Sequence, residues 1–515
     1  MRYGYRRGGA GRQGLSFSPD FRAAGASSHP KYAVPTMRTL SLVSVLGTLA
    51  SFSLAGIACG NSQTTDGTSS GVTPTGDGGP GTPGTDAGNV PIPTVKSECK
   101  GAPLPADQHF AQADTCVTIV AANLGALRQI TFAPSGDMFG VTANGSIKRF
   151  HDGDGDGFFQ ATEITEYART GGNGNNAHID VANGYLYAGS PAGVKRFPWS
   201  PDATTGGAGE DVVVGQASDG HSKHTVHVYD GWLYVQSGSY NNLVSSNKNP
   251  GRTDYDDDRS LIRRFQLSSF TPGTPLQWNS GEVVSNGLRN PNGFTKNAAG
   301  RMYAVVNGAD NVSWSGADVH NDNPGEQIVE IQAGKSYGYP FCFTAQRVIR
   351  NGSEVITPGT QLTLQAGMHD DAWCATNSTP PATFVQAHSA PLDIVFFDTQ
   401  PKGGLPEKWR GGAFVAQHGS WNRGPATGYK VVWVPFDADG KSPMPTSTAT
   451  ETTFPHDVVL GRVKDGKHED GAWSWSDDTY SDDPRPAGVA ISPVDGALYI
   501  ATDSGGYVYR VSLKP

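Results

Sequence analysis

The stretch AGVAISPVDGALYIAT, residues 487–502, shows the unit from which the fold of this chain is predicted. A short run of alternating apolar residues leads into a turn with Asp and Gly, and a second run with an aliphatic–aromatic centre follows. Alternation with period two is typical of half-buried β-strands, and a short polar turn between two such runs indicates an antiparallel hairpin. The stretch is therefore predicted to form two adjacent strands.

The same unit recurs along the chain. The other copies are ITFAPSGDMFGV (130–141), HIDVANGYLYAG (178–189), HTVHVYDGWLYVQ (224–236), PNGFTKNAAGRMYAVV (291–306) and LDIVFFDTQ…GGAFVAQ (392–417). Six copies between residues 98 and 515 give roughly 70 residues each, which is close to a propeller blade with its loops. We expect an all-β fold, a six-bladed β-propeller with long inter-strand loops. A series of β-sandwiches with a chance turn pattern is the alternative.

The composition agrees with short strands and tight turns. The 515 residues include 67 Gly and 35 Pro, and only 17% are charged, which argues against a helical bundle or coiled coil. The formal net charge of −9 makes a nucleic-acid partner unexpected, because phosphate binding needs a concentrated basic face. Beyond the N-terminal region, no apolar run is long enough to span a bilayer.

The N-terminal part is predicted to direct export. Met37 with the following Arg and the apolar run up to Ala58 have the order of a signal peptide, and residues 1–36 are then dispensable. Cys59 at the cleavage point resembles the lipidated Cys of a bacterial lipoprotein. Plain secretion and a retained transmembrane anchor are the alternatives. We therefore expect a periplasmic or cell-surface protein that contacts the membrane only through a lipid anchor.

A linker is predicted between the export signal and the folded part. Residues 60–97 are mostly Gly, Thr, Pro and Ser, with too little apolar surface to fold, so we expect a disordered tether and a domain at 98–515. Removing residues 1–58 takes away seven basic residues and one acidic residue. The mature chain then has 32 basic against 47 acidic residues, a net charge of −15.

The remaining cysteines form two local pairs, Cys99 with Cys116 and Cys342 with Cys374. In an oxidising compartment an even number of cysteines favours disulfides. Three pairings are open; we favour the local one over the other two and over buried free thiols.

The stretch DGDGDGFFQATE, residues 152–163, predicts a calcium loop. It matches the twelve-residue pattern D-x-D-x-D-G-x5-E at every ligand position. The predicted ligands are alternate carboxylates, one backbone carbonyl and a final carboxylate: Asp152, Asp154, Asp156, Phe158 and Glu163. We expect the loop to lie between strands without two flanking helices and to have a structural role. An acidic inter-strand turn without a metal is the alternative.

Further blocks carry a resemblance to a known family. They are GLRNPNGF (287–294), VNGAD (306–310), PGEQ (324–327), YGYP (337–340), HSAPL (388–392), HGSWNRGP (418–425), TGYK (427–430) and RPAGV (485–489). In this order they resemble the soluble quinoprotein glucose dehydrogenase and sorbosone dehydrogenase family over essentially all of residues 120–515. The resemblance implies a six-bladed propeller that binds pyrroloquinoline quinone (PQQ) and Ca²⁺ and oxidises a sugar by hydride transfer to the quinone.

The resemblance also implies site residues. His221 matches the general base that takes the proton of the sugar hydroxyl, a role that suits imidazole because its pKa lies near working pH. Arg289 matches the Arg at the quinone, where it would stabilise developing negative charge. Arg423 and Arg485 stand where the family places cations against the cofactor carboxylates.

Other positions complete the expected site. We expect Asn290 and His178 to line the cofactor pocket, and a strand-end position outside the pocket is the alternative for His178. His388 and His418 are candidates for the same lining. The family pattern further implies a cofactor Ca²⁺ held by the carbonyls of two residues and a second Ca²⁺ near two others: Gly308, Ala309, Glu326 and Tyr337.

One position departs from the family pattern. Where the glucose-type enzymes pair the His with an Asp, this chain has Ser239, which stabilises an imidazolium less than a carboxylate does. We expect either that an acidic residue from 254–258 takes the place of the family Asp, or that His221 is a weaker base than the family His.

The favoured hypothesis is a PQQ- and calcium-dependent sugar dehydrogenase whose electron acceptor is not specified, since the chain contains no C-x-x-C-H haem motif. A non-catalytic, calcium-stabilised propeller lipoprotein that binds carbohydrate or protein is the alternative. A metal-dependent sugar lactonase is a third hypothesis.

Overall fold

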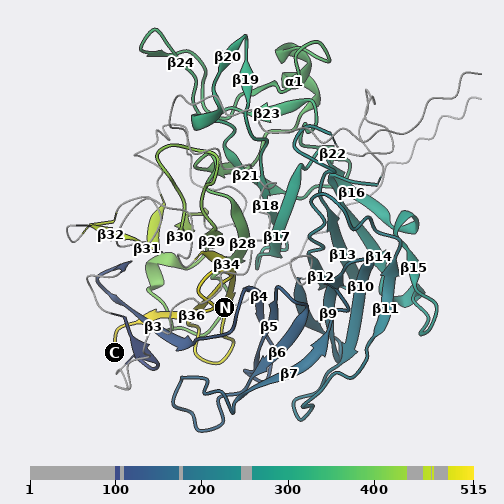
Figure 1. The fold of residues 1–515 in the computed structure, drawn as a ribbon, viewed down its shortest axis with the longest axis vertical. Coiled ribbons are helices and arrows are strands. Elements are labelled where there is room, and N and C mark those ends of the chain that lie inside the picture. The colour runs from purple at the N-terminus through teal and green to yellow at the C-terminus, as the bar shows by residue number, and fades with distance from the viewer. Residues whose placement is uncertain are drawn as a thin grey trace, which may run out of the picture. The chain divides into compact units, whose positions relative to one another are not determined.

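Six mainly antiparallel sheets of four or five strands are arranged around one axis (Figure 1). We describe a computed structural model of the chain. The described residues are 99–104, 109–172, 178–244, 258–437, 456–464, 467–468 and 485–515, and all of them belong to one compact unit within residues 73–515. The predicted signal peptide, Cys59 and the linker 60–97 lie outside the described residues, so these assignments stay predictions.

The six sheets are the blades of the predicted propeller. The first blade has β4 (Leu127–Phe132), β5 (Met138–Thr142), β6 (Ser146–Phe150) and β7 (Ile164–Arg169). The second has β8 (Ile179–Ala182), β9 (Tyr185–Ser190), β10 (Gly193–Pro198), β11 (Glu210–Val214) and β15 (Leu276–Gln277). The third has β12 (Val226–Tyr229), β13 (Trp232–Ser237), β14 (Leu261–Gln266), β16 (Glu282–Asn286) and β22 (Lys335–Ser336).

The other three blades follow the same plan. The fourth has β17 (Asn290–Lys296), β18 (Met302–Asn307), β21 (Glu326–Glu330) and β27 (Thr383–Val385). The fifth has β28 (Pro391–Phe396), β29 (Ala413–Gln417), β30 (Lys430–Val434), β31 (Asp457–Gly461) and β2 (Phe110–Ala111). The sixth has β34 (Pro486–Ile491), β35 (Leu498–Thr502), β36 (Val508–Leu513), β3 (Thr115–Ala121) and β1 (Ala102–Pro103).

The six predicted hairpins are the first two strands of the six blades, so the expected six-bladed propeller is confirmed. The first strands β4, β8, β12, β17, β28 and β34 lie nearest the axis, where they contact one another. Side chains at the axis therefore come from the first strand of each blade and from the loops that lead into these strands.

The ring is closed by strands from both ends of the described chain. β3 pairs antiparallel with β36, from Thr115 opposite Leu513 to Ala121 opposite Val508. The sixth blade is thus completed by strands from both ends of the described chain, so that the edge of β36 is covered. Between neighbouring sheets the apolar faces pack together, as Phe139 and Ile147 of the first blade do with Leu186 and Phe197 of the second.

Long connections leave the blades at a few points. The connection between β18 and β21 carries β19 (Ser313–Trp314) and β20 (Ala317–Asp318). The long connection between β22 and β27 carries β23 (Cys342–Thr344), β24 (Ile349–Arg350), β25 (Ser353–Glu354), β26 (Gln361–Thr363) and α1 (Asp371–Asn377). A further hairpin joins β32 (Val463–Lys464) and β33 (Lys467–His468). Among the described residues, α1 is the single α-helix, and none of their helices is long and apolar enough to cross a membrane.

Both local cysteine pairs form disulfides, as predicted. Cys99 is bonded to Cys116 at the start of β3. Cys342 of β23 is bonded to Cys374 of α1. The second bond fixes the helix to the long connection, which contains residues of the candidate site.

Candidate active site at the propeller axis

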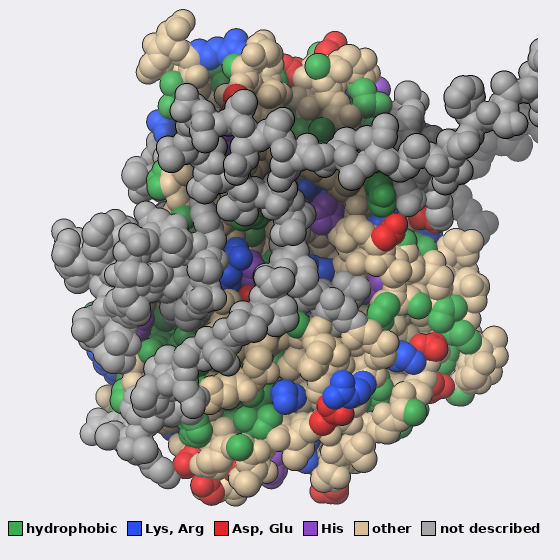
Figure 2. All heavy atoms as spheres, viewed as in Figure 1, with side chains coloured by type: hydrophobic (Ala, Val, Ile, Leu, Met, Phe, Trp, Pro, Cys, Tyr) green, Lys and Arg blue, Asp and Glu red, His purple; other side chains and the backbone are tan. Residues whose placement is uncertain are grey.

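A hollow lies at the axis where the six blades meet. It encloses about 320 Å³, part of which is open to solvent. Every blade contributes to its lining through the first strand or the residues just before it: Arg128, Gln129, His178, Lys223, His224, Thr225, Asn292, Leu392 and Ala487. Figure 2 shows Lys, Arg and His side chains in a depression at the centre of the same view. The lining of the hollow is therefore mostly polar and includes two cationic side chains, Arg128 and Lys223.

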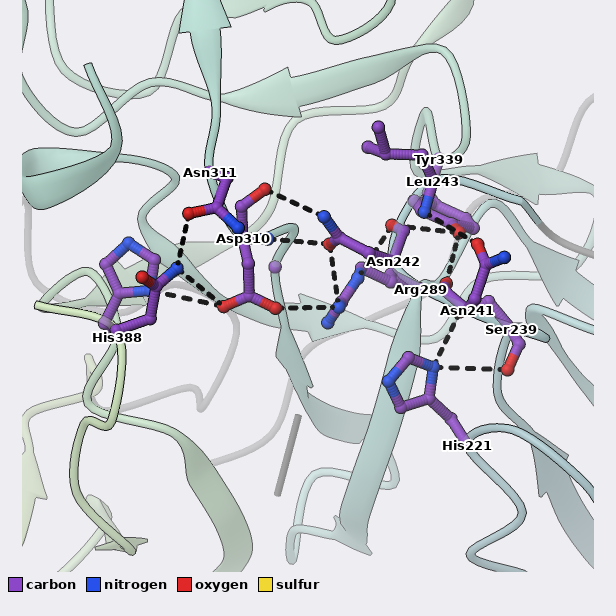
Figure 3. A network of polar contacts seen from close by, with 12 residues as sticks. His221, Ser239, Asn241, Asn242, Leu243, Arg289, Asp310, Asn311, Tyr339 and His388 are labelled. Carbon is purple, nitrogen blue, oxygen red and sulfur yellow. Dashed lines mark hydrogen bonds and ion pairs between the residues drawn. The ribbon is translucent and has the colours of Figure 1, made fainter. Parts of the chain in front are cut away.

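His221 is held in one orientation at the entry to the third blade. Its Nδ1 lies 2.8 Å from Ser239 Oγ and 3.2 Å from the Ser239 carbonyl oxygen. The Ser239 hydroxyl donates its own proton to the Asn241 carbonyl at 2.8 Å, so both groups that face Nδ1 are acceptors. A neutral His221 ring therefore carries its proton on Nδ1 and its lone pair on Nε2, which faces away from Ser239 (Figure 3).

The close approach of His221 to the neighbouring strands depends on a glycine. A Cβ added at Gly238 would lie 2.6 Å from His221 Cβ and 3.3 Å from Asn290 Oδ1. The Ser239 amide also donates to the Arg289 carbonyl at 2.7 Å. The expected base and the expected quinone-contacting Arg thus come from segments that are hydrogen-bonded to each other through Ser239.

Arg289 is fixed by a buried polar network (Figure 3). Its Nε and Nη2 donate to the Asn242 carbonyl and side chain at 3.1 and 2.9 Å. Nη2 also lies 3.2 Å from Asp310 Oδ2, and the two side chains are 3% and 8% exposed. A guanidinium with this many partners is preorganised, which is what stabilising a developing charge requires.

A second ion-pair group joins residues of the fifth, sixth and first blades. Asp503 accepts from His418 Nε2 at 2.7 and 2.8 Å and is paired with Arg128. Arg485 donates to the carbonyls of His418 and Gly419 at 3.0 and 2.7 Å. Arg128 is thus linked to His418 through Asp503, and Arg485 is linked to it through the backbone.

The Arg289–Asp310 network and the ion-pair group around Asp503 are linked to each other. The Asp310 carboxylate lies 3.2 Å from Arg289 Nη2 and 3.4 Å from Asn422 Nδ2. Asn422 belongs to the segment that begins at His418 and Gly419, whose carbonyls accept hydrogen bonds from Arg485. Arg423, next to Asn422, lies 3.6 Å from Asp322 Oδ1. His221, Arg289 and Arg485 therefore lie on one connected network rather than on separate outer walls.

The electrostatics of the second group follow from burial and the nearby cations. Burial and, after it, the charge of Arg485 lower the pKa of His418 to about 3. His418 is thus neutral near pH 7 and donates its Nε2–H to Asp503. Burial alone would raise the pKa of Asp503, but His418, Arg128 and Arg485 together lower it, so this carboxylate stays ionised.

Several buried polar atoms in or beside the hollow have no hydrogen-bond partner among the described residues. They are both side-chain polar atoms of Asn290, Oδ1 of Asn292, Nη2 of Arg128 and both ring nitrogens of His178. Leaving such a group unsatisfied costs about 1–3 kcal/mol, so a polar ligand or water is expected there. A planar quinone with several carboxylates offers matching acceptors, and the residues fit PQQ. Asn290 and His178, which the sequence predicted, would hold the cofactor together with Arg128, which the sequence did not predict.

The predicted calcium loop connects β6 and β7 without flanking helices. One carboxylate oxygen from each of Asp152, Asp154 and Asp156 lies within 4.8 Å of the other two. The Gly157 amide donates to Asp152 Oδ2 at 3.0 Å, and the amide of Phe158 donates to Asp156 Oδ1 at 2.7 Å. The donor set is the oxygen-rich kind that Ca²⁺ prefers.

Glu163 differs from the expectation. Its two carboxylate oxygens accept from the amides of Gly153 and Gln160 at 2.7 and 3.0 Å, and it does not join the aspartate group. The structure thus brings together three of the predicted side-chain ligands and uses the fourth to close the loop.

If the loop binds Ca²⁺, Asp154→Ala should lower the melting temperature only when Ca²⁺ is present. The exposed side chain of Asp154 contributes little to packing, so its loss acts through the ion. Differential scanning calorimetry with Ca²⁺ and with EDTA measures this. Asp202→Ala, at an exposed position outside the loop, is the control. If wild type and Asp154→Ala melt at the same temperature, both with Ca²⁺ and with EDTA, the loop does not bind Ca²⁺.

The remaining predicted metal residues fall into two neighbourhoods. Gly308 donates its amide to Glu326 Oε2 at 2.8 Å, and Ala309 is buried beside it. The Tyr337 hydroxyl instead donates to the Glu330 carbonyl, and its amide donates to the Asn286 carbonyl at 3.0 Å. Gly308, Ala309 and Glu326 are brought together, whereas these contacts of Tyr337 lie elsewhere, so the predicted Glu326–Tyr337 pair stays a prediction.

The sequence analysis missed several residues that line the hollow or fix its network: Arg128, Gln129, Lys223, Asn292, Asp310 and Asp503. Their only common signal is position, since most lie at the start of a first strand or just after a second strand. Had every blade's entry been searched for charged residues, Arg128 and Lys223 would have been found. Of the acids proposed to replace the family Asp, residues 254–257 lie outside the described residues, and Ser239 itself holds His221.

Comparisons with known proteins agree with this architecture. A family model described as TrAA12-like matches residues 110–514. The pyrroloquinoline quinone-dependent pyranose dehydrogenase of Coprinopsis cinerea is 27% identical over 431 residues, which are 80% of this chain but 56% of that relative. The pyrroloquinoline quinone-dependent sugar dehydrogenase of Hypocrea jecorina is 25% identical over 411 residues, 76% of this chain and 86% of the relative.

Solved structures show the same fold. The holo form of the pyranose dehydrogenase PQQ domain from Coprinopsis cinerea has a TM-score of 0.66 at 27% identity, covering 80% of this chain and 99% of that one. The calcium structure of a Trichoderma reesei enzyme of Carbohydrate-Active Enzymes Family AA12 has a TM-score of 0.63 at 23% identity, covering 79% and 98%. The chain spans about half the length of the first relative and nearly all of its solved PQQ domain. Because the family model covers most of its residues, the chain belongs to the TrAA12-like family.

Proposed function

We propose that this protein is a PQQ- and calcium-dependent dehydrogenase that oxidises a sugar hydroxyl outside the cytoplasm. The single observation that carries the proposal is the orientation of His221: its Nδ1 faces two acceptors of Ser239, so that Nε2 carries the lone pair. The relatives are named as PQQ-dependent pyranose and sugar dehydrogenases, which supports the cofactor and the substrate class.

The reaction divides between the cofactor and the protein. When bound, the quinone supplies a hydride acceptor. His221 Nε2 would take the proton from the oxygen of the sugar hydroxyl, and the resulting imidazolium would be stabilised by donating Nδ1–H to Ser239. Arg289, fixed by Asp310 and Asn242, supplies positive charge to the bound group. Arg485, Arg128 and Arg423 supply cations suited to carboxylates.

Reconstitution tests the proposal. The purified protein is mixed with PQQ and Ca²⁺, binding is followed by the cofactor absorbance, and reduction of a redox dye is measured with a panel of aldoses and sorbosone. Binding together with sugar-dependent dye reduction is expected. Absence of PQQ binding in the micromolar range would exclude the enzyme, and binding without turnover by any sugar would favour a binding module.

Ser239→Ala should lower kcat by roughly 3- to 10-fold with little change in KM, because one hydrogen bond that orients the ring is worth about 0.5–1.5 kcal/mol. The Ser239 carbonyl at 3.2 Å from Nδ1 remains and limits the loss. Steady-state kinetics of the reconstituted enzyme measure this. Ser285→Ala removes a buried hydroxyl of β16 in the same blade and is the matched control. Equal kcat for the two variants would show that Ser239 does not orient the base.

A further inference from the structure

Residues 239–242, which we call the bridge segment, connect the expected base to the expected quinone-contacting Arg (Figure 3). Its first residue, Ser239, has its hydroxyl oxygen 2.8 Å from His221 Nδ1. Its last residue, Asn242, accepts from Arg289 through its carbonyl and its side chain at 3.1 and 2.9 Å. The positions of both side chains therefore depend on one short stretch of backbone.

The bridge segment is not held by strand pairing. It follows β13, and the described residues 238–244 lie outside strands and helices. Asn241 is exposed and Asn242 is half-buried. A segment of this kind depends on side chains from elsewhere in the chain to fix its backbone carbonyls.

Tyr339 bonds to the two central carbonyls of this stretch. Its hydroxyl donates to the Asn241 carbonyl at 3.0 Å and to the Asn242 carbonyl at 3.2 Å, so one proton is shared between two neighbouring acceptors. The Asn241 carbonyl also accepts from the Ser239 hydroxyl at 2.8 Å, and the Asn242 carbonyl also accepts from Arg289 Nε. A carbonyl oxygen has two lone pairs and can accept both bonds. One phenol hydroxyl therefore touches the two carbonyls on which both arms of the site depend.

Tyr339 is itself firmly placed. It is 4% exposed and belongs to a buried apolar cluster that includes Phe343. Its amide donates to the carbonyl of Gly287 at 3.1 Å, two residues before Arg289. A Cβ added at Gly287 would lie 2.7 Å from the Gly338 amide nitrogen, so the two backbones are in direct contact. The hydroxyl is thus fixed relative to the strand that carries the Arg.

A second side chain of the same long connection bonds next to the bridge segment. Gln365 Nε2 donates to the Leu243 carbonyl at 2.9 Å and to the Pro340 carbonyl at 2.8 Å. It therefore links the residue after the bridge segment to the residue after Tyr339. The long connection between β22 and β27 holds this stretch at two points.

We propose that Tyr339, supported by Gln365, is a positioning residue: its hydroxyl holds the bridge segment so that His221 and Arg289 keep their relative arrangement. The proposal rests on the proposed function. Tyr339 acts only through backbone carbonyls, and no proton is transferred in this role. Such a residue matters because a displacement of about 1 Å in a reacting group can cost about a hundredfold in rate.

The first experiment measures both arms in the reconstituted enzyme. Tyr339→Phe keeps the ring and removes the hydroxyl, so kcat should fall by about 3- to 10-fold and the PQQ Kd should rise by a similar factor. Ser239→Ala should change kcat alone. Tyr167→Phe is the matched control, since its buried hydroxyl also donates to a carbonyl, that of Pro198 at 2.6 Å, and it should change neither constant. A Tyr339→Phe enzyme that keeps either constant at the wild-type value would overturn the proposal.

A double-variant cycle tests whether Tyr339 acts through the bridge segment. Two residues that act through one chain of contacts are coupled, so their separate effects do not simply combine. Tyr339→Phe with Ser239→Ala should therefore lose less kcat than the product of the two single losses. Tyr167→Phe with Ser239→Ala should lose no more than Ser239→Ala alone. Independent losses from Tyr339 and Ser239 would contradict an action through their shared carbonyl.

Amide hydrogen exchange tests the same contacts without cofactor or substrate. The Ser239 amide donates to the Arg289 carbonyl at 2.7 Å, and the Asp310 amide donates to Asn242 Oδ1 at 2.8 Å. In Tyr339→Phe both amides should exchange at least about threefold faster than in wild type, because the bridge segment opens more readily. Tyr167→Phe should leave both rates unchanged. Wild-type exchange rates in Tyr339→Phe would show that the hydroxyl does not hold the segment.

The measurements separate two kinds of failure. If wild type with bound PQQ oxidises no sugar, the proposed function fails, and amide exchange alone decides whether Tyr339 holds the bridge segment. Melting temperatures identify a Tyr339→Phe protein that does not fold. Gln365→Ala, at a half-buried position, then takes its place, and unchanged exchange of the Ser239 and Asp310 amides in that variant would overturn the proposal.

Discussion

Replacing His221 by alanine should lower kcat by about 10²- to 10⁴-fold, the range expected when a general base is lost. Ser239 orients the ring through Nδ1 at 2.8 Å, so that the lone pair of Nε2 is directed elsewhere. Ser239 cannot take over this task, since its hydroxyl already donates its proton to the Asn241 carbonyl.

Cofactor affinity should be almost unchanged in the same variant, because the imidazole acts on the substrate hydroxyl. Pre-steady-state reduction and PQQ titration measure the two effects separately. His369→Ala is a suitable control, because His369 stacks on Trp373 in the long connection, with ring centroids 3.7 Å apart, and does not line the hollow. A His221→Ala enzyme with more than about a tenth of the wild-type kcat would show that the base lies elsewhere.

Arg289→Ala should lower both cofactor affinity and the free energy of unfolding. The Asp310 side chain is only 8% exposed and would keep its charge without its guanidinium partner. Removing one partner of a buried ion pair costs about 3–5 kcal/mol, because the other charge stays buried. We expect a destabilisation of that order in the cofactor-free protein, measured by chemical denaturation, and a weaker PQQ Kd.

A double variant identifies the cause. Arg289→Ala with Asp310→Asn should regain part of the stability, because the unpaired charge is removed, but should not regain the cofactor affinity. Arg301→Ala, which breaks a more exposed pair with Glu330 on β21, is the matched control and should cost far less. Full stability of Arg289→Ala would mean that Asp310 is satisfied by Asn422 and its other neighbours alone.

The blades were predictable because their signals are local. Alternation within β4 and β5, or within β34 and β35, is a property of about a dozen consecutive residues, and the turn between them is set by Gly, Asp and Asn. The same holds for the loop at 152–163, whose aspartates are two residues apart and converge as predicted. The local disulfide between Cys342 and Cys374 is confirmed for the same reason.

The site was predicted in part. His221, Arg289 and Arg485 were found through the motif blocks, and the structure brings them onto one network. The spacing of Glu163 did not indicate that the amides of Gly153 and Gln160 would bind its carboxylate, and its role as a calcium ligand stays a prediction. The contacts of Tyr337 likewise depend on the path of the chain after β21, which the motif does not specify.

The sequence alone determined the strand pairs, the turns, the acidic loop and the segments that carry the motif residues, since each depends on neighbours along the chain. Only the tertiary structure decided which side chains meet at the axis. Arg128 and Asp503 are separated by 375 residues, and Gln129 and Asp393 by 264. Such contacts exist because ring closure brings the first strands of the six blades together. Closure is stabilised by packing between all six sheets, so no single stretch of sequence determines it.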